Sequence, residues 1–465
     1  MTITFLGWII LPLSLALIIS KPEWVYAMAI FFLPFSATAV VNLGSGDSGS
    51  GIQVWFYLAI LLLLRWAFVS LFEFEIIINK ELRRPLAYLM LFVIVCAISL
   101  LMPFWINGRL QIMSPFLMDF TTTPLVFSSK NITGFIYILV GFSFTIFIAN
   151  KNTTSKEFRR SSSLYLLSCV FLAGWGLLQL CLHAMHLPYP AMIFNNSASP
   201  AAAGYKETIG AVDIARLTSA AVEPGMLVQT LLVGIAFTLP ALLGNGYIWS
   251  RYKDRMAAFL LISICLAATS STGYIGLVLL FILICWELHR SKQLRASFVV
   301  LSIGGMFAAV GAYYAIGIFH DIINSALLNK SSSYSALERG KTIYYALQYF
   351  LDYPILGVGW ASVTSHDLVA KLLSNTGILG FTTFCTFIGI LLIKLSSRLR
   401  TGIIDKTHFD QASVILFIAC VEMLALAVLS EFPDVFGHFW FILGMGIAAT
   451  LRSLNKEPIF GRGTT

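Results

Sequence analysis

Charged residues are scarce in this sequence. Asp, Glu, Lys and Arg make up only 11% of its 465 residues, while 58% are hydrophobic. Soluble domains carry about 25% charged and 45–50% apolar residues, so this chain has too little polar surface to be an ordinary soluble enzyme. Its 30 basic residues form short separate clusters, and we therefore expect no nucleic acid partner.

Cysteine pairing motifs are also absent. The seven cysteines lie in or beside apolar runs, and none forms a CxxC pair, which argues against a metal-binding or disulfide framework. We interpret them as small buried hydrophobic residues. No basic residue precedes the first apolar run, so we interpret the N-terminus as a retained membrane span and not as a cleaved signal peptide.

Apolar runs dominate the chain. Each is roughly 20 residues long, the length at which a helix crosses a hydrocarbon core of about 30 Å. We predict an all-α, polytopic transmembrane helix bundle of about 12–14 spans, forming a single integral membrane domain over 1–465. The 13 spans that we count are 3–20, 23–43, 53–72, 86–106, 132–149, 164–187, 225–243, 256–270, 273–288, 297–318, 376–394, 411–430 and 438–451.

Basic residues gather in seven segments on one side of this predicted bundle. These are residue 21 and the segments 80–84, 151–160, 251–255, 290–295, 394–406 and 452–462. Short cytoplasmic loops carry an excess of Lys and Arg, so we predict a periplasmic N-terminus and a cytoplasmic C-terminus. The long segments 188–224 and 319–375 then lie on the periplasmic side. Loops longer than about 12–15 residues are usually functional, so we expect the chemistry there.

The first long segment contains Arg216 and ends in Glu223-Pro224. Proline suits the first turn of a helix, where a backbone N–H would be unpaired anyway. Glu223 would then lie at the positive end of the helix dipole. Two interpretations remain open: Glu223 is only a charged helix start, or it is a positioned carboxylate that pairs with Arg216 or binds a sugar hydroxyl.

The second long segment predicts an amphipathic helix over 334–350, ended by Pro354 and a glycine-rich turn. It would lie on the membrane, pack across the mouth of the bundle, or remain a surface helix with solvated charges. Its expected apolar face comprises Ala336, Ile343, Leu347 and Phe350. Another face comprises Glu338, Lys341, Tyr345 and Gln348.

A short helix is predicted to follow. Thr364-x-x-Asp367 is typical of a capping box and would place His366 in the first helical turn. Backbone N–H groups there can hold a phosphate, and the helix dipole would keep the imidazole neutral and able to accept a proton. The alternative is a histidine with a purely structural role.

Taken together, these motifs resemble the family of O-antigen polymerases (Wzy-type) and O-antigen ligases. The Ser-rich turn 269–273, followed by an apolar span, resembles the hairpin of that family. Two positions depart from the family pattern: Thr272 stands where Arg is frequent, and Asp367 where Asn is common. The motif residues are Arg216, Glu223, Pro224, Arg339, Ala346, Phe350, Pro354, Gly357, Gly359, His366, Asp367, Leu372, Asn375, Gly377 and Gly380.

The resemblance implies a membrane glycosyltransferase of the bacterial inner membrane, with a GT-C-like helical bundle and helical periplasmic loops. Its substrates would be undecaprenyl-pyrophosphate-linked oligosaccharides, and it would need no cofactor and no metal. We expect His366 to act as general base, with Glu223 as its rival. We expect Arg216 and Arg339, assisted by Lys341, to bind the pyrophosphate. Implied partners are the lipid bilayer, with a chain-length-regulating co-polymerase and a flippase as further candidates.

Two other functions stay open. An O-antigen ligase would use similar loop residues to transfer finished polymer to lipid A-core, although the Arg216…Glu223-Pro224 segment favours a polymerase. A lipid-linked oligosaccharide flippase or other transporter would use Glu422, which like Arg65 falls inside a predicted span. Charged residues in spans are costly, so we expect the two to pair or to line a polar cavity, unless Arg65 extends to the membrane surface.

Overall fold

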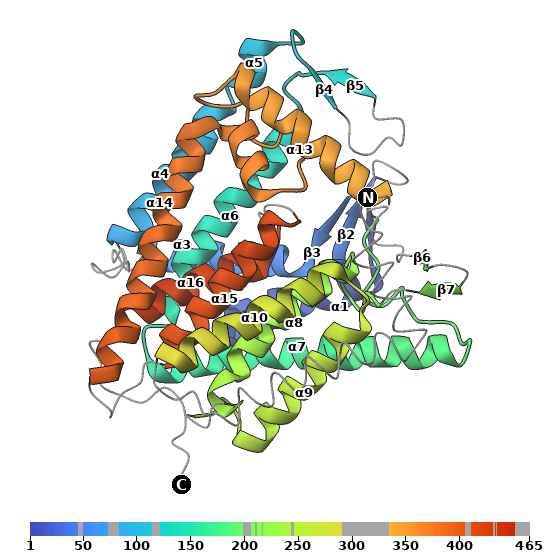
Figure 1. Cartoon of the computed structure of the whole chain (residues 1–465), viewed down its shortest axis with the longest axis vertical. Coiled ribbons are helices and arrows are strands. Elements are labelled where there is room, and N and C mark those ends of the chain that lie inside the picture. Colours follow the sequence, from blue (N-terminus) through green and yellow to red (C-terminus); the bar gives the residue numbers. More distant parts are fainter. Residues whose placement is uncertain are drawn as a thin grey trace.

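The computed structural model describes residues 1–44, 50–72, 83–113, 121–198, 206–209, 212–215, 217–242, 246–290, 334–404, 411–430, 433 and 435–451. This part of the chain is mostly helical (Figure 1). The helices are α1 (Phe5–Ser20), α2 (Pro22–Phe32), α3 (Val54–Phe72), α4 (Arg83–Ser99), α5 (Met102–Ile106), α6 (Ser129–Lys151), α7 (Ser155–Ala184), α8 (Pro224–Leu242), α9 (Arg251–Ala267), α10 (Ser271–Arg290), α13 (Tyr334–Asp352), α14 (Leu368–Ile404), α15 (Gln411–Val428) and α16 (Gly437–Leu451).

Short strands accompany the helices. The strands are β1 (Thr2–Ile3), β2 (Ala39–Leu43), β3 (Ser50–Gln53), β4 (Gln111–Met113), β5 (Thr122–Pro124), β6 (Lys206–Ile209) and β7 (Val212–Ala215). All pairings are antiparallel: β1-β2-β3 forms one sheet, and β4–β5 and β6–β7 are two-stranded. The first long segment, 188–224, therefore contains a strand pair where we expected helical loops, whereas the second contains α13 as expected.

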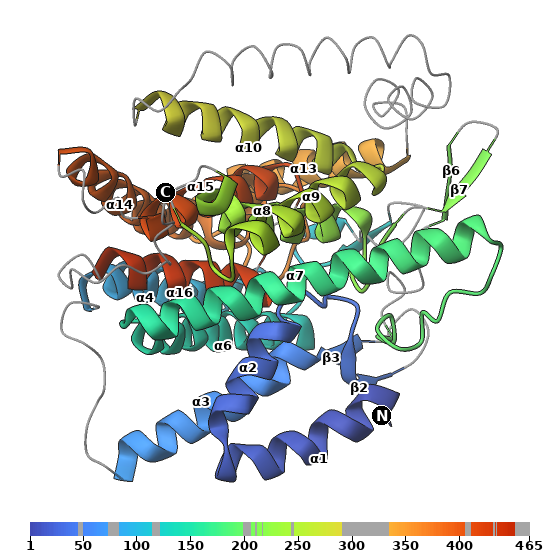
Figure 2. The ribbon, with the colours of Figure 1, turned by 90° about the horizontal axis from the view of Figure 1, so that it is seen from below.

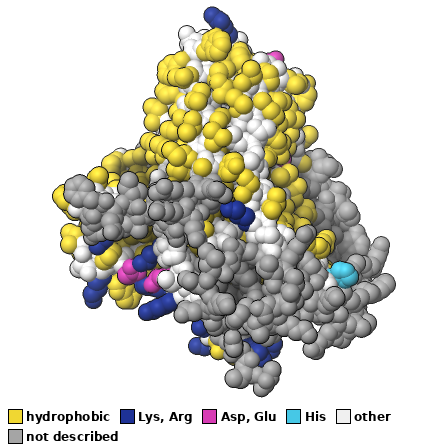
Figure 3. Space-filling model, turned by 90° about the vertical axis from the view of Figure 1, so that its left-hand side faces the viewer, with side chains coloured by type: hydrophobic (Ala, Val, Ile, Leu, Met, Phe, Trp, Pro, Cys, Tyr) yellow, Lys and Arg dark blue, Asp and Glu magenta, His cyan; other side chains and the backbone are white. Residues whose placement is uncertain are grey.

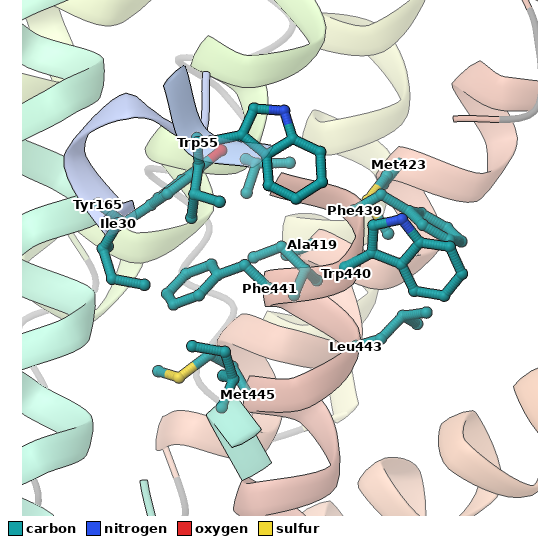
Figure 4. Packing of buried hydrophobic residues seen from close by; sticks show 14 of the residues in the cluster. Ile30, Trp55, Tyr165, Ala419, Met423, Phe439, Trp440, Phe441, Leu443 and Met445 are labelled. Carbon is teal, nitrogen blue, oxygen red and sulfur yellow. The ribbon is translucent and has the colours of Figure 1, made fainter. Parts of the chain in front are cut away.

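The core lies around α16, which is mostly apolar and is buried from Gly437 to Thr450. A helix without a polar face needs neighbours on every side. Figure 4 shows Trp440 and Phe441 of this helix among aromatic and aliphatic side chains of α2, α3, α7 and α15. The backbone of α6 approaches closely at Gly141, where a Cβ atom would overlap the indole of Trp440. Small residues of this kind allow tight helix contacts in membranes.

Six helical segments are long and apolar enough to cross a membrane, which indicates a membrane protein. They are Val54–Phe72, Leu86–Ile106, Ser129–Lys151, Ser155–Ala184, Pro224–Leu242 and Leu368–Ser397. Large hydrophobic side chains are exposed along α3, α4 and α14, and Figure 3 shows hydrophobic side chains covering the upper part of one face. Such a surface suits contact with lipid, because apolar side chains can face lipid tails without the free-energy cost of facing water.

The predicted bundle of 13 spans is not confirmed. The apolar run 23–43 is not one helix: α2 ends at Phe32, Pro34 follows, and β2 pairs with β3. Proline cannot donate the hydrogen bond that would continue a helix, and the β-branched Val40 and Val41 suit a strand. Further apolar helices, such as α1 and α16, are shorter than 18 residues. The predicted span 297–318 lies outside the described residues.

The two ends of the molecule differ. Strands β2, β3, β6 and β7 lie at the right-hand side of Figures 1 and 2, whereas α3 and α14 end at the opposite side. The segment after α7 belongs to the first end, because Thr38 donates a hydrogen bond to the carbonyl of Phe194 at 2.6 Å and the N–H of Ala37 donates to Ala220 at 3.1 Å. We call it the strand end.

Basic residues meet at the opposite end. Glu23, at the start of α2, forms ion pairs with Lys151 at 2.6 Å and with Arg160 at 2.7 Å. Arg159 donates to the carbonyl of Ile248, just before α9, at 2.8 Å. Three of the predicted basic segments, 21, 151–160 and 251–255, are therefore brought to one end, which we call the basic end.

Candidate functional site

Glu223 immediately precedes α8 at the strand end. Pro224 begins the helix as predicted, and the carbonyl of Glu223 accepts the N–H groups of Met226 and Leu227 at 3.1 Å. The Glu223 side chain is half-buried. Glu223 thus lies at the positive end of a helix that is mostly buried.

Hydroxyl groups border the same helix start. The turn between α9 and α10 brings Ser270 and Thr272 next to α8, as the predicted hairpin requires. A Cβ atom on Gly225 would lie 3.6 Å from the Thr272 hydroxyl oxygen and 3.8 Å from that of Ser270. The absent side chain of Gly225 therefore lets the hydroxyls of the hairpin approach the first turn of α8.

Helix α13 packs against α14 and β4. Its buried face differs from the predicted one: Thr342, Ala346 and Tyr349 are buried, whereas Leu347 is exposed. Ala346 and Tyr349 join α5, the β4–β5 pair and the start of α14 in a second hydrophobic cluster. The Tyr349 hydroxyl accepts the N–H of Met113 at 2.9 Å. The small Ala346 permits close packing, and the Tyr349 hydroxyl reaches the backbone of β4. The buried face of α13 therefore depends on these tertiary contacts and not on hydrophobicity alone.

Arg339 connects α13 to the end of α15. Its Nη1 atom donates to the carbonyl oxygen of Leu429 at 2.8 Å. The next residue, Ser430, accepts a hydrogen bond at 2.9 Å from the side-chain amide of Gln229, in the second turn of α8. Arg339 is therefore linked through the end of α15 to the second turn of α8, the helix that Glu223 precedes. A guanidinium group has five donors, so Arg339 can hold this carbonyl and still bind an anion.

Glu338 precedes Arg339 on α13. It is half-buried, and burial raises the pKa of its carboxyl group above the usual value. The Glu223 carboxylate raises the pKa of Glu338 further, whereas Arg339 opposes the shift. Two carboxylates from the two long segments are thus close enough to interact. Sequence reasoning placed Glu338 only on a polar helix face, because spacing within one helix carries no information about a carboxylate 115 positions away.

The turn after α13 is anchored on α14. Gly357 and Gly359 have φ values of 66° and 106°, where glycine is favoured. The Asn375 side chain accepts the N–H of Val363 at 3.1 Å and donates to its carbonyl at 2.9 Å. Gly377 interrupts α14 with a φ of 63°, which leaves a short first segment. These motif residues therefore shape the turn before His366.

The predicted helix start at Thr364 is wrong. Helix α14 begins at Leu368, and the Asp367 side chain accepts the N–H of Ala370 at 2.7 Å. His366 is consequently one residue before the N-cap and not in the first turn. Its backbone N–H lies 3.5 Å from the Thr342 hydroxyl oxygen on α13, and its side chain is half-buried. Asp367 and not Thr364 caps the helix, because the Asp367 carboxylate directly accepts the unpaired backbone N–H of Ala370 in the first turn.

The Asp367 cap can be tested by its stability effect. We expect Asp367→Ala to lower the free energy of unfolding by about 1 kcal/mol, the usual loss when an N-cap side chain is removed. Asp367→Asn should preserve stability, because an asparagine oxygen caps equally well. Thermal unfolding of the purified variants in detergent measures both. Equal stability of Asp367→Ala and the unchanged protein would contradict the assigned cap.

The predicted site residues are thus partly brought together. Arg339 lies on α13 and contacts the end of α15. The backbone of His366 contacts α13 at Thr342, and Glu223 precedes α8. Lys341 is exposed on α13, two residues after Arg339, and residues two apart in a helix do not face each other. Its assisting role stays a prediction. Arg216 lies outside the described residues.

The two charged residues that we predicted to lie inside spans do not pair with each other. Arg65 donates from Nε to the carbonyl of Ile18, near the end of α1, at 2.9 Å, so it stabilises a helix C-terminus. Glu422 is fully buried in α15, and neither carboxylate oxygen has a hydrogen-bond partner among the described residues. It packs against the bare backbone of α10, where a Cβ atom on Gly276 would lie 2.9 Å from Oε1.

Across the described ranges, no group of three or more His, Cys, Asp or Glu side chains is arranged to hold a metal ion. The residues described above offer carboxylates, hydroxyls and a guanidinium, which are groups that bind hydroxyl-rich and anionic ligands. Comparison with protein-family models and with curated proteins found no match to this chain.

Proposed function

We propose that this protein is a membrane glycosyltransferase that polymerises undecaprenyl-pyrophosphate-linked oligosaccharide repeat units into a surface polysaccharide. The reaction would take place at the periplasmic face of the bacterial inner membrane, which we equate with the strand end. The observation that carries the proposal is the position of α13, from the second long segment. Through Arg339 it contacts Leu429 at the end of α15, where Ser430 binds Gln229 of α8, and through Thr342 it contacts the backbone of His366. Glu223, from the first long segment, immediately precedes α8.

The proposed reaction joins two lipid-linked saccharides. A hydroxyl oxygen at the non-reducing end of the acceptor attacks C1 of the donor sugar. The bond between C1 and the pyrophosphate oxygen breaks, and its electron pair leaves with the lipid pyrophosphate. The hydroxyl proton passes to His366 or, in the rival assignment, to Glu223. General base catalysis of this kind contributes about 10²–10⁴-fold in rate.

Arg339 would stabilise the leaving pyrophosphate. Its guanidinium group is permanently charged and can bind phosphate oxygens in pairs. The hydrogen bond to Leu429 would fix the orientation of that group before substrate binds. Arg216 would supply a second guanidinium. No metal takes part in the proposed reaction, in keeping with the family that the motifs resemble.

The proposal predicts chain growth by the isolated protein. Purified protein in liposomes should convert externally supplied lipid-linked repeat units into longer lipid-linked chains, detected by mass spectrometry. Cells lacking the protein should accumulate single lipid-linked repeat units, because polymerisation would stop at the first unit. Accumulation of full-length unattached polymer in these cells would instead indicate the ligase.

Glu422 favours a second candidate function. A buried carboxyl group without a hydrogen-bond partner in the described part of the chain is typical of proton-coupled transporters. The same liposomes distinguish the two functions. Movement of labelled lipid-linked saccharide across the bilayer that depends on a proton gradient, without chain growth, would support a transporter and contradict the polymerase.

A further inference from the structure

The outward side of α13 carries a row of apolar side chains, although the helix already buries Thr342, Ala346 and Tyr349 on its inner side. The members of this row are all exposed, and they follow one another at intervals of seven, three and four residues. Such intervals place side chains on one face of a helix. We call this row the apolar stripe; it consists of Leu337, Tyr344, Leu347 and Leu351.

Polar side chains occupy a separate part of the outward side. Lys341, Gln348 and Asp352 are also exposed, at intervals of seven and four residues. The outward side is therefore divided lengthwise into an apolar and a polar half. A helix that only packed on the protein and faced water elsewhere would gain nothing from a second apolar face. Contiguous exposed apolar groups mark a contact surface.

The apolar stripe continues into the surface of a segment long enough to cross the membrane. Ile355 follows the end of α13 and is exposed. Its carbonyl accepts the N–H of Leu379, in α14, at 3.4 Å. Leu379 and its neighbour Ile378 are exposed too, and they lie within the apolar segment Leu368–Ser397. The same environment that covers the outside of α14 is thus adjacent to the end of α13.

Aromatic side chains surround this junction. Helix α5 shares a hydrophobic cluster with α13, and its Phe104 and Trp105 are exposed. Trp and Tyr gather where the hydrocarbon core of a membrane meets the headgroups, and Trp105 and Tyr344 fit that level. Figure 1 shows α13 at a steep angle to α14 and not alongside it. A helix that crosses the direction of a span lies toward the plane of the membrane.

We propose that α13 is an interfacial helix, which inserts its apolar stripe among the acyl chains of one leaflet and turns its polar half toward water. Helices of this kind lie at the boundary between headgroups and acyl chains. The partner of the apolar stripe is therefore the lipid bilayer itself. This placement does not depend on the proposed reaction. For that reaction, it would hold Arg339 at the level of the lipid phosphates.

Two neighbouring tyrosines provide the test. Tyr344, in the apolar stripe, is 59% exposed, whereas Tyr345 is 37% exposed. If water alone covered α13, hydroxyl radicals would oxidise Tyr344 more than Tyr345. In lipid nanodiscs, which leave both membrane faces open to water, we expect the reverse order, located by tandem mass spectrometry. A lipid-soluble diazirine should label the apolar stripe, as it should Ile393, an exposed residue of α14.

A pair of adjacent cysteine variants gives an independent measurement. Leu351 and Asp352 are both exposed at the end of α13. In nanodiscs, a charged water-soluble maleimide should modify the Asp352→Cys variant and leave the Leu351→Cys variant mostly unmodified. Asp352→Cys is the matched control, because it differs in position by one residue. Mass spectrometry of the peptide that contains the new cysteine separates this signal from the native cysteines.

Three results would overturn the proposal. They are stronger oxidation of Tyr344 than of Tyr345 in nanodiscs, equal modification of the two cysteine variants, and protection of the apolar stripe without diazirine labelling. The last would mean that protein and not lipid covers the stripe. None of these measurements requires chain growth, so a failure of the proposed function and a failure of this inference are separate results.

Discussion

Replacing Arg339 by alanine is expected to abolish long polymer in cells while the protein remains in the membrane at normal levels. The physical reason is the negative charge that develops on the departing pyrophosphate. Removing one preorganised donor to such a charge lowers the rate about 10²–10³-fold. Chain-length distribution on gels, together with the amount of protein in isolated membranes, measures the effect. Normal polymer in Arg339→Ala would remove Arg339 from the proposed mechanism.

A lysine variant separates the structural and chemical roles of Arg339. Arg339→Lys retains one positive charge and can still donate to the carbonyl of Leu429. A lysine ammonium is a point charge and cannot bind phosphate oxygens with a planar fork. We therefore expect normal thermal stability with only partial recovery of activity. Lys253→Ala, which removes an exposed charge at the start of α9 near the basic end, is the control and should leave polymer length unchanged.

Replacing Gly141 by alanine is expected to disrupt the packing of α6 on α16. The added Cβ atom would overlap the fully buried indole of Trp440. Protein interiors are close-packed, so one helix must shift. Insertion of a methyl group into a filled core typically costs about 1–3 kcal/mol. We expect a lower unfolding temperature in detergent and less protein in the membrane.

Gly174 provides the matched control for this prediction. It lies in α7, and no atom is within 4 Å of the position that a Cβ atom would occupy. Gly174→Ala should leave stability unchanged or slightly raise it, because alanine favours a helix over glycine by about 1 kcal/mol. Equal unfolding temperatures for the Gly141 and Gly174 variants would contradict the assigned contact between α6 and α16.

Local sequence signals predicted several features of the site. Pro224 marked the start of α8, the Ser-rich stretch marked the turn between α9 and α10, and the periodicity of 334–350 marked α13. Each depends on neighbouring residues along the chain, through proline geometry, turn chemistry or helical spacing. The helix start near His366 was placed wrongly, because Thr364 and Asp367 both suit a cap and only the fold decides between them.

The membrane character of this chain was determined by its sequence alone. Few charges and repeated apolar runs are properties of the sequence itself and do not depend on any tertiary contact. Tertiary structure decided which apolar residues face protein and which face the outside. It turned the run 23–43 into a short helix and a strand, and it brought Arg339 of α13 to the end of α15 and the backbone of His366 to Thr342. Both results depend on contacts between distant segments, which hydropathy and motif spacing along one chain do not encode.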